Sequence, residues 1–252
     1  MRILSIDSSL GTQLAVVDAA PSAAGARALQ VLSQDQQADT RRHAESLGQM
    51  LSRALSAPEA AERPLNAVVA ATGPAPFTGL RAGLVTAGVV GRTRGVPVHG
   101  VSSLDAVARR ALDELGAQEG QTEPVVLVAT DARRREVYTA LFRANGPDDV
   151  TRLTEIIVCP PAQVAQRLAE QAPGPGGGSG GIHVVAGSGA SLYPELAEMA
   201  SCQKALAPVS GDALTQVRIA LARLERGEQL STQPLYLRHA DVQMPTARKR
   251  VR

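Results

Sequence analysis

Three turns of the chain carry the residues with the clearest capacity for chemistry. Asp7-Ser8-Ser9 follows an apolar strand pattern, and a carboxylate in that position can bind a hydrated metal ion. Gly73 opens a turn after a second buried strand pattern, and Gly187-Ser188-Gly189 separates a strand pattern from a helix pattern. Backbone amides exposed at such junctions attract phosphate. Each turn also has a purely structural interpretation, because Ser8 can bond its own turn and two glycines can make a plain tight turn.

Residue patterns for other enzyme chemistry are missing or stand in the wrong context. No histidine has a partner four residues away, and no His-Glu-x-x-His sequence occurs, so a zincin-type metallopeptidase is not supported. A Walker A loop is excluded because neither lysine follows a glycine-rich turn between a strand and a helix. Residues 177–181 match Gly-x-Ser-x-Gly, but they precede a strand pattern instead of following one, which favours a surface loop over a nucleophile elbow.

The stretch Gly73-Pro74-Ala75-Pro76-Phe77-Thr78-Gly79-Leu80-Arg81 predicts a turn specialised for close backbone approach. Two prolines and a glycine fix the turn, and Thr78 can cap the first turn of a helix. The helix that follows carries Gly79, Gly83, Ala87 and Gly91 at four-residue steps. Its interior glycines cost about 3 kcal/mol relative to alanine, which close packing must offset. The stripe therefore packs either on its own sheet or against another protein.

Composition indicates a folded α/β protein. The 252 residues have 44% hydrophobic content, enough for one large or two modest cores. A net charge of +2 and only five aromatic residues argue against a base-stacking nucleic-acid platform, and the basic end at residues 248–252 is expected to be a solvated terminus. Cys159 and Cys202 stand alone, which fits a reducing cytoplasm. No export segment is visible, and no apolar run approaches the ~20 residues of a membrane span.

Hydrophobic periodicity predicts two halves that begin alike. In the first half, three strands precede an alternation of helices and strands, and the second half starts with three strands again. The predicted strands are Ile3–Ile6, Gln13–Asp18, Arg27–Ser33, Asn66–Thr72, Val96–Gly100, Val125–Thr130, Glu136–Arg143, Arg152–Val158 and Ile182–Ala186. The predicted helices are Arg41–Ala57, Thr78–Arg94, Ser102–Leu115, Ala162–Gln171, Ser191–Ala200 and Asp212–Arg226. This order indicates a duplicated architecture with parallel strands joined by crossover helices.

Four motifs in order give the chain a resemblance to a known family. The stretch from Gly73 to Arg81 resembles the Gly-Pro-Gly-Ser-Phe-Thr-Gly-Val-Arg signature of the TsaB (YeaZ) family, with departures at Ala75 and Pro76. The other three motifs are Arg2-Ile3-Leu4-Ser5-Ile6-Asp7-Ser8-Ser9, Asp131-Ala132-Arg133 with Glu136-Val137-Tyr138, and Pro234-Leu235-Tyr236-Leu237-Arg238. The resemblance implies two duplicated ribonuclease-H-like domains of the actin-like, Hsp70-like (ASKHA) ATPase superfamily. We predict residues 1–116 as the first domain and 117–252 as the second, whose C-terminal segment can pack back on the first.

The same resemblance implies a noncatalytic dimerisation subunit that pairs with its catalytic relative TsaD. That relative carries a metal-binding histidine pair where this chain reads Ser102-Ser103-Leu104-Asp105-Ala106-Val107-Ala108, so neither a catalytic nor a metal-binding residue is expected here. TsaE completes the implied complex, a homodimer forms in the absence of TsaD, and tRNA is reached only through the complex. The partner surface implied by the family lies on the helices at Arg41–Ala57 and Thr78–Arg94. The predicted contact residues are Leu47, Met50, Leu51, Phe77, Gly79, Arg81, Gly83 and Ala87.

Nucleotide binding is expected to be weak or vestigial, with no cofactor required. Asp7, Ser8, Gly73 and Gly187 are the candidate residues for such an ATP or ADP site, and the turn at Asp7 lacks the glycines of a working phosphate loop. The leading hypothesis is a cytoplasmic subunit that supports threonylcarbamoyl transfer to the adenosine beside the tRNA anticodon. The alternative is an autonomous nucleotide-dependent small-molecule kinase, which only the architecture supports.

Overall fold

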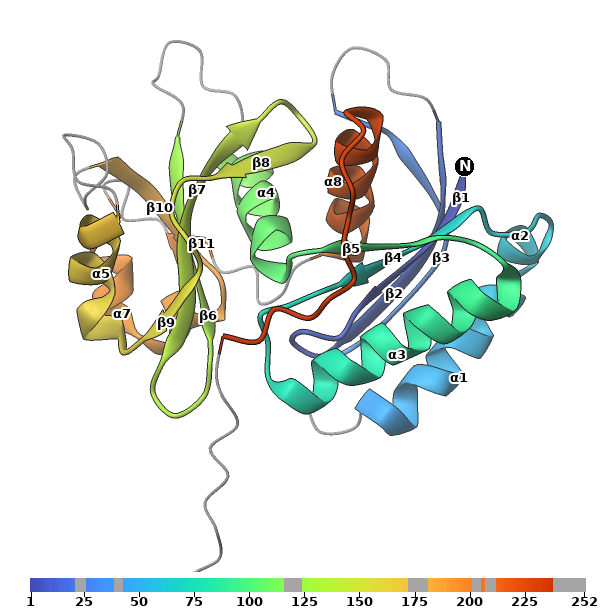
Figure 1. Ribbon diagram of the computed structural model, residues 1–252, viewed down its shortest axis with the longest axis horizontal. Helices are drawn as coiled ribbons and strands as arrows, with labels where there is room; N and C mark the ends of the chain where they lie inside the picture. Colours follow the sequence, from blue (N-terminus) through green and yellow to red (C-terminus); the bar gives the residue numbers. More distant parts are fainter. Residues whose placement is uncertain are drawn as a thin grey trace, which may run out of the picture.

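The computed structural model describes residues 1–20, 26–38, 43–115, 124–171, 181–200, 205–206 and 212–237. Two β-sheets lie on either side of a central pair of helices (Figure 1). Several sequence predictions fall outside the described residues and stay predictions. These are the helix start at 41–42, the domain boundary at 116/117, the Gly-Ser tract at 172–180, Cys202, Arg238, His239 and the basic tail.

The first sheet has the strand order β3-β2-β1-β4-β5. The central strand β1 pairs antiparallel with β2 and parallel with β4, with Ile3 opposite Val17 on one side and Ala67 on the other. The bounds are β1 Arg2–Asp7, β2 Thr12–Ala19, β3 Leu29–Gln37, β4 Ala67–Ala71 and β5 Val98–Val101. The three-strand start and the parallel strands that follow are as the sequence predicts.

The second sheet repeats this order as β8-β7-β6-β10-β11, with β9 also paired to β7. The bounds are β6 Val125–Asp131, β7 Val137–Asn145, β8 Asp149–Arg152, β9 Ile157–Cys159, β10 Ile182–Ala186 and β11 Ala205–Leu206. The single strand predicted at Arg152–Val158 is wrong, because the chain breaks into β8 and β9. The break lies at Thr154, whose hydroxyl accepts a hydrogen bond from the Leu141 amide at 3.0 Å. The Thr154 hydroxyl thus accepts the hydrogen bond that a backbone carbonyl of a neighbouring strand would otherwise accept.

Helices cover the sheets as their apolar faces require. The first-half helices are α1 His43–Ser56, α2 Pro58–Ala61, α3 Phe77–Arg94 and α4 Ser103–Leu115. The second-half helices are a 3₁₀ turn Pro161–Gln163, α5 Val164–Gln171, α6 Ser188–Leu192, α7 Pro194–Ala197 and α8 Ala213–Glu225. The single helix predicted at Ser191–Ala200 is two short helices, since Pro194 has no amide hydrogen to continue the first one. Asp212 caps α8 by accepting a hydrogen bond from the Leu214 amide at 2.8 Å.

The two central helices are exchanged between the halves. Helix α4 follows β5 of the first sheet, yet Leu104 and Val107 join Val126 and Phe142 in the core of the second sheet. Helix α8 comes late in the chain but packs on the first sheet, where its buried residues share a core with β1, β2 and β4. A separate core fills the opposite face of the first sheet beneath α1 and α3. Figure 1 shows α4 and α8 side by side between the sheets.

An arginine-aspartate network joins α4, α8 and β8. Asp105 of α4 binds Arg152 of β8 at 2.9 Å and Arg223 of α8 at 2.8 Å. Asp149 accepts hydrogen bonds from Arg223 at 3.0 Å and from Arg226. Both carboxylates are almost fully buried. The network therefore neutralises buried charge where the two halves meet.

Each half thus contains the same five-strand order with helices on its faces. This is the duplicated ribonuclease-H-like architecture of the actin-like and Hsp70-like ATPase superfamily. Within the described part of the chain, no helix combines the length and apolarity that crossing a lipid bilayer requires.

Candidate functional site

Asp7 ends β1 as a buried carboxylate that has three hydrogen-bond donors. Its Oδ1 accepts from the Ser9 amide at 2.8 Å and the Ser9 hydroxyl at 2.6 Å, and its Oδ2 accepts from Gln216 Nε2 at 2.9 Å. Burial raises the pKa of Asp7 to about 6, and the hydrogen bonds from Ser9 oppose that rise. Asp7 therefore ties β1 to α8 and changes charge near neutral pH. The described residues hold no group of three or more His, Cys, Asp or Glu arranged for a metal ion.

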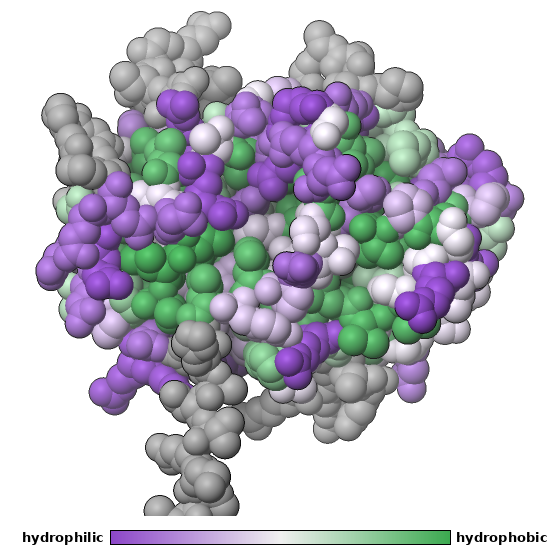
Figure 2. Space-filling model, in the orientation of Figure 1, coloured by the Kyte–Doolittle hydropathy of each residue, from purple (hydrophilic) through white to green (hydrophobic). Residues whose placement is uncertain are grey.

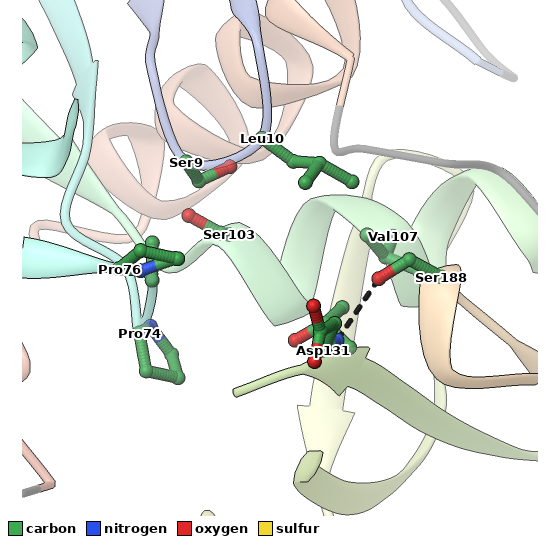
Figure 3. Close-up of a pocket in the computed structure, with 10 residues that line it drawn as sticks. Ser9, Leu10, Pro74, Pro76, Ser103, Val107, Asp131 and Ser188 are labelled. Atoms are coloured by element: carbon green, nitrogen blue, oxygen red, sulfur yellow. Dashed lines mark hydrogen bonds between the residues drawn. The ribbon is translucent and has the colours of Figure 1, made fainter. Parts of the chain in front are cut away.

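A small pocket lies where the two halves meet at this turn. It is lined by Ser9, Leu10, Pro74, Ala75, Pro76, Ser103, Val107, Thr130, Asp131 and Ser188. Figure 3 shows Ser9 and Ser103 at one end and Asp131 and Ser188 at the other, where the Ser188 hydroxyl accepts from the Asp131 amide at 2.9 Å. The interior volume is about 20 Å³, which is room for about one water molecule.

Gly73 and Gly187 border this pocket and have left-handed backbone angles. Their φ values are +85° and +105°. A Cβ on Gly187 would lie 2.4 Å from the Ala129 carbonyl oxygen, and one on Gly73 would lie 2.8 Å from the Leu80 side chain. Both positions thus need glycine for turn geometry and close packing. The structure brings the turns of Asp7, Gly73 and Gly187 to one place, and nucleotide binding by them stays a prediction.

The small-residue stripe of α3 packs on its own sheet. A Cβ on Gly83 would lie 2.1 Å from Ser8 Oγ, and one on Gly91 would lie 2.3 Å from the Val98 side chain. Ser8 donates a hydrogen bond from its hydroxyl to the Gly79 carbonyl at 2.8 Å, so it bonds the helix and not its own turn. Ala87 is fully buried in the same core. Of the two interpretations of the stripe, internal packing accounts for Gly79, Gly83 and Ala87.

The apolar ridge of α1 also faces inward. Leu47 and Met50 are each 2% exposed and belong to the core beneath α1 and α3, with Leu51 partly buried against it. In the chain by itself, Leu47, Met50, Gly83 and Ala87 all contact the interior of their own domain. Their place at a partner surface stays a prediction.

The outer face of α3 is apolar and accessible. Val85 is 65% exposed and Val89 is 55% exposed, one turn apart on the helix. Gly88 lies beside them with no atom within 4 Å of the position a Cβ would take. In Figure 2, hydrophobic and hydrophilic patches alternate over the region where Figure 1 places α3. Two exposed valines one turn apart make this face of α3 a candidate for a protein contact.

Phe77 and Arg81 continue this face to the start of α3, where they meet Tyr236. The Arg81 guanidinium carbon lies 3.5 Å from the centroid of the Phe77 ring. Arg81 Nε donates a hydrogen bond to the Tyr236 hydroxyl at 2.8 Å. Phe77 and Tyr236 are both exposed, and their ring centroids are 4.9 Å apart. Two of the four motifs from the sequence, around Gly73–Arg81 and Pro234–Arg238, thus meet at the surface.

Sequence reasoning missed the residues that act through long-range contacts. Gln216, which holds Asp7, stands in an ordinary amphipathic helix pattern with no local signal of its role. Ser103 lines the pocket with a hydroxyl for which the described residues offer no hydrogen-bond partner. The motif around Tyr236 was visible, but its contact with Arg81 spans 155 positions of sequence.

The sequence matches the model of a known protein family. The model for TsaD, described as tRNA N6-adenosine threonylcarbamoyltransferase, matches residues 30–222, well over half of the sequence. The chain belongs to this family. The match runs from β3 of the first sheet through the second sheet and includes all the helices from α1 to α7, whereas β1 and β2 lie before its start.

The chain is also similar to individual proteins. An uncharacterised protein of Mycobacterium tuberculosis is 44% identical over 123 residues, which are 47% of this chain and 53% of that protein. The chain therefore spans about half the length of this relative. YeaZ from Pseudomonas aeruginosa superposes with a TM-score of 0.68 at 23% identity over 94% of this chain and 99% of that one. A second Pseudomonas aeruginosa structure, described as similar to peptidase YEAZ, gives 0.69 at 23% identity over the same shares. The predicted resemblance to the YeaZ fold is confirmed.

Proposed function

We propose that this chain is a noncatalytic, activating subunit of a cytoplasmic complex that transfers threonylcarbamoyl to the adenosine beside the tRNA anticodon. A role in this tRNA modification system follows from membership of the TsaD family and from the YeaZ-like fold. The finer proposal is that the chain pairs with a catalytic TsaD subunit, with TsaE completing the complex, and that it requires no cofactor of its own. It pairs with a second copy of itself when TsaD is absent.

The observation that carries the proposal is the outer face of α3. Val85 and Val89 expose apolar surface on α3, and the opposite side of this helix packs closely against the first sheet. Burying such side chains contributes about 25 cal/mol for each Å² of apolar surface removed from water. A partner helix that lies along this face would also contact the exposed Gly88, where the backbone is uncovered.

Helix α4 supports the noncatalytic role. The segment Ser102–Ala108 stands where the resemblance places the histidine pair of the catalytic relative, and three of its side chains are committed to structure. Leu104 and Val107 fill the core of the second half, and Asp105 binds two arginines. The alternative of an autonomous kinase is supported only by the architecture.

Binding of purified TsaD from the same organism tests the proposal. We expect Val85→Glu and Val89→Glu each to weaken the complex at least tenfold in analytical ultracentrifugation, because a charge would be buried in an apolar contact. Leu192→Glu is the matched control, since Leu192 is 56% exposed on α6 in the other half. We also expect threonylcarbamoyladenosine to form on tRNA only when TsaD is present. Wild-type affinity in both valine variants would refute the α3 surface, and turnover by the chain alone would refute the noncatalytic role.

A further inference from the structure

Arg81 is held in a fixed conformation at the surface. Its guanidinium carbon lies 3.5 Å from the centroid of the Phe77 ring and 5.5 Å from the centroid of the Tyr236 ring. The hydrogen bond from Nε to the Tyr236 hydroxyl fixes the rotation of the group. Arginine in water samples many rotamers, so a guanidinium restrained in advance loses little entropy when it binds.

The two terminal nitrogens of Arg81 remain for a ligand. Among the described residues, no carboxylate forms an ion pair with Arg81, and its one hydrogen bond uses Nε. A guanidinium edge with two parallel N–H groups matches a carboxylate or a phosphate in a bidentate geometry. The positive charge of the Arg81 guanidinium is therefore suited to an acidic group from outside the chain.

The segment after α8 positions Tyr236. The Leu235 amide donates to the Thr72 carbonyl at 2.9 Å, and Leu235 and Leu237 pack against the core of the second half. Further back, the Gly100 amide donates to the Leu230 carbonyl at 3.3 Å. Tyr236 is thus fixed by contacts with both halves, and it acts on a ligand only through Arg81.

The surroundings favour a protein over an RNA as the source of the acidic group. Val85 and Val89 lie one and two turns beyond Arg81 on the same helix, so the basic end continues into apolar surface. Arginine and aromatic residues are enriched at the centre of protein interfaces. Phe77 and Tyr236 already contact each other and Arg81, which takes up part of the ring surface on which a base would stack.

We infer that Arg81, clamped by Phe77 and Tyr236, anchors an aspartate or glutamate side chain of the protein partner. The inference rests on the proposed function, because the partner is the TsaD subunit whose contact is assigned to the outer face of α3. It adds the chemistry of recognition, a bidentate ion pair at the N-terminal end of that face. Tyr236 is a positioning residue for this ion pair.

Titration calorimetry with TsaD measures the effect of each group. We expect Arg81→Lys to weaken binding about tenfold or more, since lysine keeps the charge but loses the fork and the stacking. Tyr236→Phe removes only the hydroxyl and is expected to weaken binding about 2- to 10-fold. Arg94→Lys, at the opposite end of α3, is the matched control and should bind as wild type. Circular dichroism and thermal melting of each variant check that the fold is kept.

Chemical cross-linking then identifies the group that Arg81 meets. A water-soluble carbodiimide joins an amine to a carboxylate as an amide and takes up the water released. With Arg81→Lys mixed with TsaD well above the dissociation constant, mass spectrometry should find the introduced amine linked to an aspartate or glutamate of TsaD. Arg94→Lys should give no such product.

The outcomes separate this inference from the proposed function. If Val85→Glu abolishes binding while Arg81→Lys binds as wild type and gives no cross-link, the partner surface stands and the carboxylate anchor is refuted. If Val85→Glu and Val89→Glu bind as wild type, the proposed surface itself fails. If Arg81→Lys leaves TsaD binding unchanged but weakens retention of tRNA by the complex, the acidic group is a phosphate and the inference is overturned.

Discussion

Replacing Gly83 with alanine should destabilise the protein, although alanine is the better helix former. In the middle of a helix alanine is favoured over glycine by about 1 kcal/mol. At Gly83 the new methyl group would lie 2.1 Å from Ser8 Oγ, so the helix or the turn at Ser8 must move. Overpacking of this kind costs about 1–3 kcal/mol. We therefore expect a net loss of up to about 2 kcal/mol, combining the two contributions.

Gly88→Ala on the same helix is the matched control. No atom lies within 4 Å of the Cβ position there, so only the helix preference acts, and we expect a gain of about 1 kcal/mol. The two variants should then differ by about 1–3 kcal/mol. The sequence has no tryptophan, so urea unfolding is best followed by circular dichroism. For a chain of this size each kcal/mol moves the melting temperature by about 2–4 °C.

Ser8→Ala provides the second arm of a double-mutant cycle. Without the hydroxyl, the nearest atom to the new methyl group is Ser8 Cβ at 3.0 Å, which is a much milder contact. Gly83→Ala should therefore cost at least about 1 kcal/mol less in the Ser8→Ala background than in the wild type. If Gly83→Ala stabilises the wild type as much as Gly88→Ala does, the stripe is not closely packed against Ser8, and the internal-packing explanation is refuted.

Two further predictions concern buried charge. The pKa of Asp7, raised to about 6 by burial, means that the folded state binds a proton more tightly than the unfolded one, so stability falls as pH rises from about 4 to 6. Relative to wild type, Asp7→Asn should thus gain about 1.4 kcal/mol in unfolding free energy between pH 5 and pH 7.5, and a pH-independent difference would contradict the assignment. Asp149→Asn should cost about 3 kcal/mol or more in urea unfolding, because it leaves Arg223 and Arg226 short of a buried counter-charge. A loss below 1 kcal/mol, the value typical of exposed pairs, would show that the network contributes little.

Local sequence patterns were sufficient for most of the secondary structure. The sequence predicts a helix at Thr78–Arg94, because apolar and small residues recur there with the helical period. The observed helix α3 begins one residue earlier, at Phe77. The errors fall where a tertiary contact or a proline overrides the period. Thr154 interrupts a predicted strand by bonding Leu141, and Pro194 divides a predicted helix.

The candidate site was less predictable from the sequence, because the direction in which a helix face points depends on the whole fold. The stripe of glycines in α3 indicated a close contact, and the structure supplies that contact from Ser8 on the neighbouring strand turn. Pattern alone does not say which side of a glycine-rich helix faces its own sheet. The pairing of Arg81 with Tyr236 has no local signal either, since any two surface residues so far apart could come together.

The exchange of α4 and α8 bears on how the chain is made. Strands β1, β2 and β4 leave the ribosome early, but one apolar face of their sheet is covered by Val217, Ala220 and Leu221 of α8. That cover is synthesised only after β5 and the strands of the second sheet, so the first sheet emerges with this face open to water. The unfinished sheet offers a hydrophobic surface to chaperones, and stable folding of the first half waits for α8.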